Sequence, residues 1–154
     1  MTKSIKLTTD QMRLISLFQN VTKVTAHDCI DDEKKDRIIF VVHTGKMGLA
    51  IGKGGSNIKS LHNILKRNVE LVEYFDDPAK FLKNMLNPKL VNDVRLDKKQ
   101  DGSLHAVVIV DPVKKGIVVG REGRHAEKAR LFAKRYFDIS NVLISSHEIK
   151  QMEM

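Results

Sequence analysis

Residues 50–61 read AIGKGGSNIKSL and place three glycines, Gly52, Gly54 and Gly55, within four positions. Glycine adopts backbone dihedral angles that are closed to other residues, and it lets a backbone approach a ligand closely. Between two helices, such a turn also points the unsatisfied amide groups of the second helix at whatever binds there. The chemistry that this pattern predicts is the binding of an anion, and phosphate is the usual one.

Two common phosphate-binding motifs do not fit this stretch. A Walker loop requires a glycine where Met47 stands and a serine or threonine where Gly54 stands. A dinucleotide fingerprint counted from Gly52 requires a third glycine at the position of Asn57. The pattern that does fit is Gly-x-x-Gly between two helices, at residues 52–55.

The same motif occurs a second time because the chain contains an internal repeat. A shift of 68 positions lays residues 41–67 over residues 109–135 without a gap. Three glycines of the first copy fall on three of the second: Gly48, Gly52 and Gly55 on Gly116, Gly120 and Gly123. The second loop reads Gly-Arg-Glu-Gly, with Glu122 in place of a glycine. Agreement over 27 residues indicates a duplicated module, which has to be recognised before any fold is assigned.

Positive charge gathers around both loops. The chain carries a formal net charge of +8, with 27 Lys and Arg against 19 Asp and Glu. Residues 45–67 hold five basic residues and no acidic one, and residues 114–135 hold eight basic residues and two acidic ones. A solvated helix face usually mixes the two signs, so paired basic windows favour a polyanionic partner.

Both copies predict the same order of elements. In the first copy, a capping box at Thr8 and Gln11 begins a helix that we expect to reach about Asn20. We expect strands at residues 24–30 and 37–42, a short helix at 45–51, a helix after the loop with Ile58, Leu61 and Leu65 on its buried side, and a strand at 69–74. In the second copy, we expect a helix from Asp77-Pro78 to about residue 86 and strands at 90–96 and 104–110. A short helix at 114–119 should precede the second loop. After the loop we expect a helix and then a strand at 142–145, and the buried side of that helix should carry Ala126, Ala129, Ala133 and Phe137. The sequence thus predicts an α+β chain of two modules, residues 1–76 and 77–147, with a C-terminal tail at 148–154.

Three segments give the chain a resemblance to a known family: residues 50–61, residues 76–88 (DDPAKFLKNMLNP) and residues 118–130 (VVGREGRHAEKAR). Over roughly residues 5–147 the chain resembles a tandem of type II KH domains and is similar to the KH pair of NusA transcription factors, above all the short archaeal form. The resemblance implies that each module is a three-stranded mixed sheet packed against helices. It also implies binding of single-stranded RNA near the elongating polymerase, with an effect on pausing, termination or antitermination. KH loops of this kind clamp about four backbone nucleotides.

The predicted RNA-binding residues fall into three groups. The loop residues that we expect to hold phosphates are Gly52, Lys53, Gly54, Gly55 and Ser56 in the first copy, and Gly120, Arg121, Glu122 and Gly123 in the second. The cations expected to supply charge are Lys46, Lys53, Lys59, Lys114, Arg121, Arg124 and Lys128. The residues expected to wall the grooves for bases are Gly48, Ile51, Ile58, Gly116, Val119 and Ala126, although a core role fits the aliphatic ones almost equally well. The acidic Glu122 should weaken the second clamp unless its arginine neighbours offset its charge. Phe132 and Phe137 are expected in a core, not as stacking platforms.

Several classes of function are disfavoured. The six histidines form no metal-ligand spacing, and Cys29 has no identifiable base partner, so we expect no enzyme, no metal and no cofactor. No apolar run approaches the roughly 18 residues of a membrane span. The N-terminus lacks the apolar stretch of a signal peptide and the single cysteine cannot form an intrachain disulfide, so a reducing, cytoplasmic compartment is expected. We also expect a monomer.

Two other functions remain open at this stage. One is a ribosome-associated or ribosome-biogenesis KH protein, and the other is a KH-fold module that docks to protein and binds RNA only weakly. RNA polymerase or another transcription factor is the protein partner that the resemblance suggests. No residue identifies a contact to a 2′-hydroxyl group, so the sequence leaves the choice between RNA and single-stranded DNA open.

Overall fold

The computed structural model describes residues 5–146, which form two compact units. Lys6–Phe75 forms one unit, here called the first module, and the residues from Asp76 onward belong to the other, the second module. The tail predicted at residues 148–154 lies outside the described residues.

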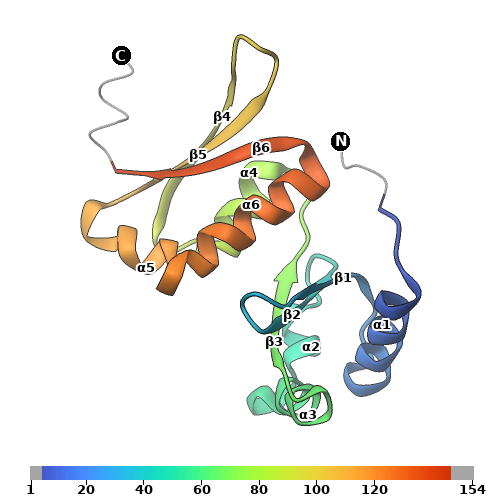
Figure 1. The fold of residues 1–154 in the computed structure, drawn as a ribbon. Coiled ribbons are helices and arrows are strands. Elements are labelled where there is room, and N and C mark those ends of the chain that lie inside the picture. The colour runs from blue at the N-terminus through green and yellow to red at the C-terminus, as the bar shows by residue number, and fades with distance from the viewer. Residues whose placement is uncertain (1–4, 147–154) are drawn as a thin grey trace. The chain divides into compact units, whose positions relative to one another are not determined.

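Both modules have the same topology (Figure 1). The first contains α1 (Thr9–Thr22), β1 (Ala26–Asp32), β2 (Arg37–Val42), α2 (Met47–Ile51), α3 (Ser56–Leu65) and β3 (Asn68–Glu73). The second contains α4 (Pro78–Met85), β4 (Val91–Lys98), β5 (Leu104–Val110), α5 (Lys115–Val119), α6 (Arg124–Phe137) and β6 (Ile139–Ser145). The strand orders are β1-β2-β3 and β4-β5-β6, and in each sheet the central strand pairs antiparallel with the strand before it and parallel with the strand after it. The predicted α+β architecture of two three-stranded mixed sheets with helices is confirmed.

The predicted first strand was placed two residues too early. The hydroxyl of Thr22 accepts a hydrogen bond from the amide of Val24 at 3.0 Å and donates to the carbonyl of Phe18 at 2.8 Å. Val24 therefore belongs to the turn that closes α1, and β1 begins only at Ala26. The central strands β2 and β5 have the predicted bounds, whereas β6 begins at Ile139, three residues before the predicted start.

Side-chain caps fix where the first helix of each module begins. The Thr8 hydroxyl accepts from the Gln11 amide at 3.1 Å, and the Gln11 side chain accepts from the Thr8 amide at 2.8 Å, which completes the predicted capping box. The same Gln11 donates to the carbonyl of Cys29 at 2.8 Å and so ties α1 to β1. In the second module, the Asp77 carboxylate caps α4 by accepting from the Ala79 amide at 3.3 Å.

Each module has an aromatic core on the helix side of its sheet. In the first, the rings of Phe18 and Phe40 stack with centroids 4.5 Å apart. In the second, Phe81 makes edge contacts with Phe132 and Phe137, whose centroids lie 6.2 and 5.6 Å away. Phe132 is fully buried and Phe137 is 7% exposed, so the expectation that both belong to a core is confirmed. Burial of each such ring stabilises a fold by about 2–3 kcal/mol relative to exposure.

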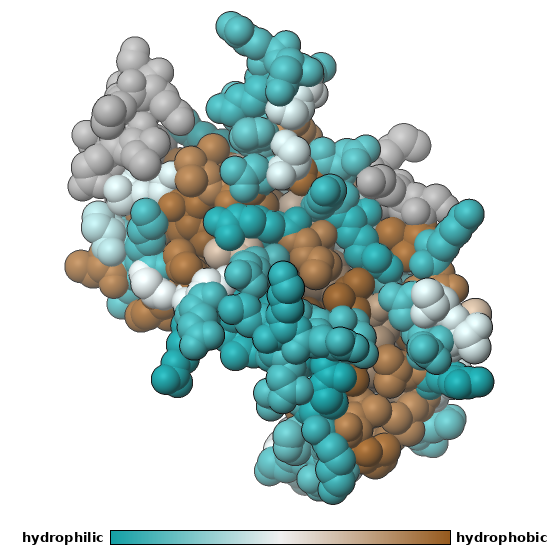
Figure 2. Space-filling model, in the orientation of Figure 1, coloured by the Kyte–Doolittle hydropathy of each residue, from teal (hydrophilic) through white to brown (hydrophobic). Residues whose placement is uncertain are grey.

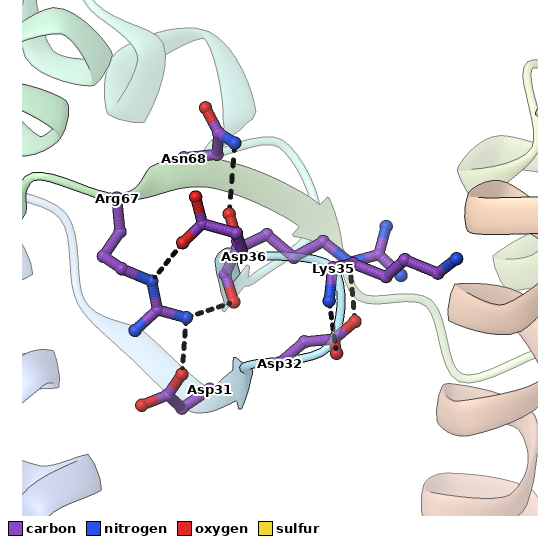
Figure 3. A network of polar contacts seen from close by, with 7 residues as sticks. Asp31, Asp32, Lys35, Asp36, Arg67 and Asn68 are labelled. Atoms are coloured by element: carbon purple, nitrogen blue, oxygen red, sulfur yellow. Dashed lines mark hydrogen bonds and ion pairs between the residues drawn. The ribbon is translucent and has the colours of Figure 1, made fainter. Parts of the chain in front are cut away.

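Arg67 holds elements of the first module together at the end that lies opposite the glycine loop (Figure 3). Its guanidinium donates to Asp31 and to Asp36, at 2.8 Å in both cases, and so joins the β1–β2 turn to the residue before β3. Asn68 adds a hydrogen bond to the carbonyl of Asp36 at 3.1 Å. The hydrogen bond to Asp31 is the main cause that raises the pKa of Arg67, so this arginine stays charged. Two carboxylates thus hold this side chain in place.

Candidate nucleic-acid interface

The two Gly-x-x-Gly loops have the same backbone conformation. At the first position, φ and ψ are 79° and 167° in Gly52 and 84° and 165° in Gly120. At the third position, they are 63° and 21° in Gly54 and 54° and 28° in Glu122. At the fourth position, they are 76° and 18° in Gly55 and 72° and 16° in Gly123. Each loop is a single 3₁₀ turn between a five-residue helix and a longer one. Glu122 therefore adopts the left-handed conformation that Gly54 has in the first copy, without a change in the loop.

Some of the loop amides are used to build the loop. The Gly52 amide donates to the Gly48 carbonyl at 3.1 Å, and the Gly55 amide donates to the Gly52 carbonyl at 3.1 Å. The second loop repeats both bonds, from Gly120 to Gly116 and from Gly123 to Gly120, each at 3.0 Å. Two of the amides predicted to hold phosphate therefore donate within the chain, and for the first loop the prediction narrows to the amides of Lys53 and Gly54 at the exposed tip.

The first glycine of each loop is sterically required. A Cβ atom on Gly52 would lie 2.8 Å from the side chain of Asn57, and one on Gly120 would lie 2.4 Å from the ring of His125. At the other glycines of the two loops, and at Gly48 and Gly116 in the preceding helices, a Cβ atom would have nothing within 4 Å. The backbone at these positions therefore borders open space that a ligand can approach.

An apolar groove lies beside the first loop. It has a volume of about 550 Å³ and is lined by Met47, Ile51, Gly55, Ile58, Lys59, Val69 and Leu71. These residues come from α2, the loop, α3 and β3 in turn. The side chain of Ile51 is 37% exposed, and that of Ile58 is half-buried. Both therefore reach the groove surface, although the sequence also allowed a place in the core for them. The groove thus joins an apolar wall to the loop and to the ammonium group of Lys59.

The predicted cations differ in how accessible they are. The side chains of Lys46, Lys53, Lys59, Lys114 and Arg121 are exposed, and Arg124 is half-buried. Lys128 is only 8% exposed, on the buried side of α6, so it is not part of the interface proposed below. Its predicted role in RNA binding rested on its charge alone. The apolar periodicity of the helix around Ala129 was the signal that this position faces inward.

Sequence reasoning missed the strand side of the first groove. Val69 and Leu71 of β3 line it, and Met47 of α2 completes it. A signal was available, because Val69 and Leu71 alternate along β3 and therefore lie on one face of the sheet. Figure 2 shows exposed apolar surface among hydrophilic side chains over the helices of the first module.

The described residues contain neither a metal-ligand cluster nor a membrane-spanning helix. Within residues 5–146, no three His, Cys, Asp or Glu side chains gather as metal ligands. No helix in that part of the chain is both long enough and apolar enough to cross a membrane.

Comparison with known proteins agrees with this geometry. The family model described as "KH domain" matches residues 13–75. A protein of Halobacterium salinarum named "Probable transcription termination protein NusA" is 35% identical over 92% of this chain and 99% of its own length. The chain belongs to the archaeal NusA family. A protein of the same name from Methanocaldococcus jannaschii is 31% identical over 91% of this chain and 75% of its own length.

The chain is also similar to a bacterial NusA protein and to a solved structure. Bacillus subtilis "Transcription termination/antitermination protein NusA" is 27% identical over 54% of this chain and 22% of its own length. The solved structure described as "Crystal structure of APE1850" superposes with a TM-score of 0.82 and 36% identity, over 90% of this chain and all of that one. The Halobacterium relative and the APE1850 structure each match 90% or more of this chain, so both copies of the repeat fall within the matched length.

Proposed function

We propose that this NusA-family chain binds single-stranded RNA and acts as a transcription termination or antitermination factor. The observation that carries the proposal is the pair of Gly-x-x-Gly loops with matching dihedral angles, each surrounded by exposed cations. We infer that the KH modules span residues 1–76 and 77–147. A monomer in the cytoplasm that acts near RNA polymerase is the setting that best fits the family.

Binding would divide between phosphate and base contacts. The amides of Lys53 and Gly54 and the side chains of Lys46 and Lys53 face the path of the RNA backbone, where they neutralise phosphate charge. The neighbouring groove, which includes Ile51, takes the bases against aliphatic side chains. Such a groove suits an unstacked strand, because bases in a duplex present no free faces to it.

The test is fluorescence anisotropy with a short single-stranded RNA of randomised sequence, the matching DNA and an RNA duplex. We expect a preference for single-stranded RNA, and we expect the double variant Lys53→Asp/Gly54→Asp to lose at least tenfold in affinity. The new carboxylates repel phosphate at the centre of the clamp. Glu122 in the second loop shows that an acidic side chain is compatible with the backbone conformation at the position of Gly54.

The control is Lys34→Asp, which makes the same change of charge as the Lys53→Asp part of the loop variant, on an exposed side chain in the β1–β2 turn, at the far end of α3 from the loop. Its effect should be small and should vanish in higher salt. Equal, weak binding to all three nucleic acids, unchanged in the loop variant, would contradict the proposal. It would favour the docking of protein as the role of the fold. Copurification with ribosomal subunits instead of polymerase would favour the ribosomal alternative.

A further inference from the structure

The two modules differ on the strand side of their grooves. Val69 pairs with Ile38 in the first sheet, and Val142 pairs with Ala106 in the second. Ile38 and Ala106 are 68 positions apart, which is the offset of the repeat, so Val142 is the structural counterpart of Val69. By the same register, Leu71 pairs with Phe40 and Ile144 pairs with Val108, which is 68 positions after Phe40. Ile144 is therefore the counterpart of Leu71.

These counterparts have different exposure. Val69 and Leu71 are half-buried and line the first groove. Val142 is 1% exposed and Ile144 is 5% exposed. On the helix side, Ile58 is half-buried and lines the first groove, whereas its counterpart Ala126 is 2% exposed. Three apolar residues that line the first groove thus have buried counterparts in the second module, whereas Val119, the counterpart of Ile51, stays half-buried.

The longer helix of the second module accounts for part of this difference. α3 and α6 begin at equivalent positions, but α3 has 10 residues and α6 has 14, so α6 continues for about one more turn along β6. Arg130 of α6 also donates from Nε to the carbonyl of Val142 at 3.1 Å and so bridges the helix and the strand. Its counterpart in α3, His62, instead contacts the carbonyl of Arg67 at 2.9 Å, and Val69 stays half-buried.

The charge beside the groove also favours RNA binding in the first module over the second. Lys59 lines the first groove, and the offset of the repeat places Glu127 at the same position of α6. An acidic group at this distance from the loop disfavours a polyanion, whereas the lysine attracts one. The second loop nevertheless keeps the backbone conformation of the first and the exposed Arg121, although Glu122 adds an acidic group to it.

We propose that the two modules divide RNA recognition: the first groove binds bases and sets the sequence preference, while the second module holds the RNA backbone through its loop alone. This inference rests on the proposed RNA-binding function. It makes the Arg130 bridge and Ala126 the features that close the second groove, and it makes Ile51, Ile58 and Leu71 the residues on which base preference depends.

The test compares a matched pair of groove variants, Ile51→Ser and Val119→Ser, which occupy the same position of the repeat. The probes are labelled single-stranded oligoadenylate, oligocytidylate and oligouridylate, and the readout is the ratio between the strongest and the weakest Kd. We expect Ile51→Ser to reduce this ratio at least fivefold and Val119→Ser to leave it within twofold. A thermal melt of each variant shows that its fold is intact. An equal loss of preference in the two variants would overturn the proposal.

A second measurement does not depend on how the variants fold. RNA containing 4-thiouridine is crosslinked to the unmodified chain, and the crosslinked residues are identified by mass spectrometry. We expect crosslinks from the base to residues of the first groove, such as Ile58 and Lys59, and none to the matching face of α6. Base crosslinks to Ala126 or Arg130 would contradict the division of roles. A complete lack of RNA binding by the unmodified chain would instead overturn the proposed function.

Discussion

At the scale of single residues, alanine substitutions at Gly48 and Gly52 should both weaken RNA binding but should change the stability of the fold in opposite directions. Gly48 lies in α2, and a Cβ atom there would meet nothing within 4 Å. Gly48→Ala should therefore raise the free energy of unfolding by about 0.5–1 kcal/mol, since alanine favours a helix more than glycine does. The new methyl group would project where we expect RNA to approach, so affinity should fall by about fivefold. Chemical denaturation and anisotropy check the two effects.

Gly52→Ala should have the opposite effect on stability. Gly52 has φ 79° and ψ 167°, a region that is essentially restricted to glycine, and its Cβ atom would lie 2.8 Å from Asn57. Adopting that backbone costs about 1–3 kcal/mol, so the variant should be destabilised and should also lose RNA binding. If Gly48→Ala also lowered stability, the view of α2 as an unstrained helix open to ligand would be wrong.

Glu122 allows its charge and its backbone conformation to be tested separately. Glu122→Gln removes the charge but retains the left-handed conformation at φ 54°. We expect RNA affinity to rise by about two- to fivefold at low salt, the size of an exposed charge interaction, and stability to change little. Glu122→Gly should give the same gain in affinity and should also relieve about 1 kcal/mol of backbone strain.

Salt and the direction of the change decide the interpretation of the Glu122 variants. The gain in affinity should shrink in high salt, because screening weakens interactions between exposed charges. Weaker binding by Glu122→Gln would mean that the carboxylate itself accepts a hydrogen bond from RNA. The second loop would then differ from the first in kind and not only in strength.

At the scale of elements, Arg67 holds the turn between β1 and β2 against the start of β3. Its side chain is 25% exposed, and those of Asp31 and Asp36 are 41% and 69% exposed. Partly exposed ion pairs contribute about 0.5–1 kcal/mol each, so Arg67→Ala should lower the free energy of unfolding by about 1–2 kcal/mol. RNA affinity should stay unchanged, because this end of the module lies opposite the loop.

A double-mutant cycle isolates the Arg67 contact. Combining Arg67→Ala with Asp31→Ala should cost less than the sum of the two single changes, with a coupling energy of about 0.5–1 kcal/mol that decreases in salt. Additive losses would show that the ion pair contributes nothing and that Arg67 acts only through packing of its aliphatic stem.

The elements could be predicted from the sequence where a local cause fixes them. The Thr8 capping box, the Asp77 cap and the apolar strand β2 each follow from a few neighbouring residues, and all three occur as expected. The start of β1 could not be predicted, because the hydroxyl of Thr22 takes the Val24 amide that a longer strand would have used. The aligned repeat ends at residue 135, but the apolar periodicity that continues to Phe137 predicted how far α6 extends.

The candidate site was predictable in its loops and less so in its grooves. Glycine spacing within a few residues determines the loop backbone, so both loops have the expected form. A groove is different, because it is made by elements distant in sequence. The repeat places Ala126 on Ile58, but only the register of β3 and β6 shows that Val142 is buried where Val69 is accessible. Burial also removes Lys128 from a set that charge alone had suggested.

At the scale of the whole molecule, the net charge of +8 makes RNA affinity depend on salt. The logarithm of the binding constant should fall linearly with the logarithm of the salt concentration, with a slope of about −0.7 for each phosphate contact on a single strand. Lys53→Ala and Arg121→Ala, at the same position of the two loops, should each reduce the steepness of this slope by about 0.7 if each neutralises one phosphate. The pair therefore counts contacts in each module separately.

The length of the RNA decides whether both modules hold one strand. On an RNA of about four nucleotides, the span of one KH loop, only one module can bind at a time, so either variant leaves the other module available and loses little affinity. On an RNA several times longer, binding of the second module becomes intramolecular, and loss of either loop removes that gain, which should cost about tenfold or more. Isothermal titration with both lengths measures the difference. Equal losses at the two lengths would mean that the modules bind RNA independently, and the duplication would then add a second site without adding affinity for a single strand.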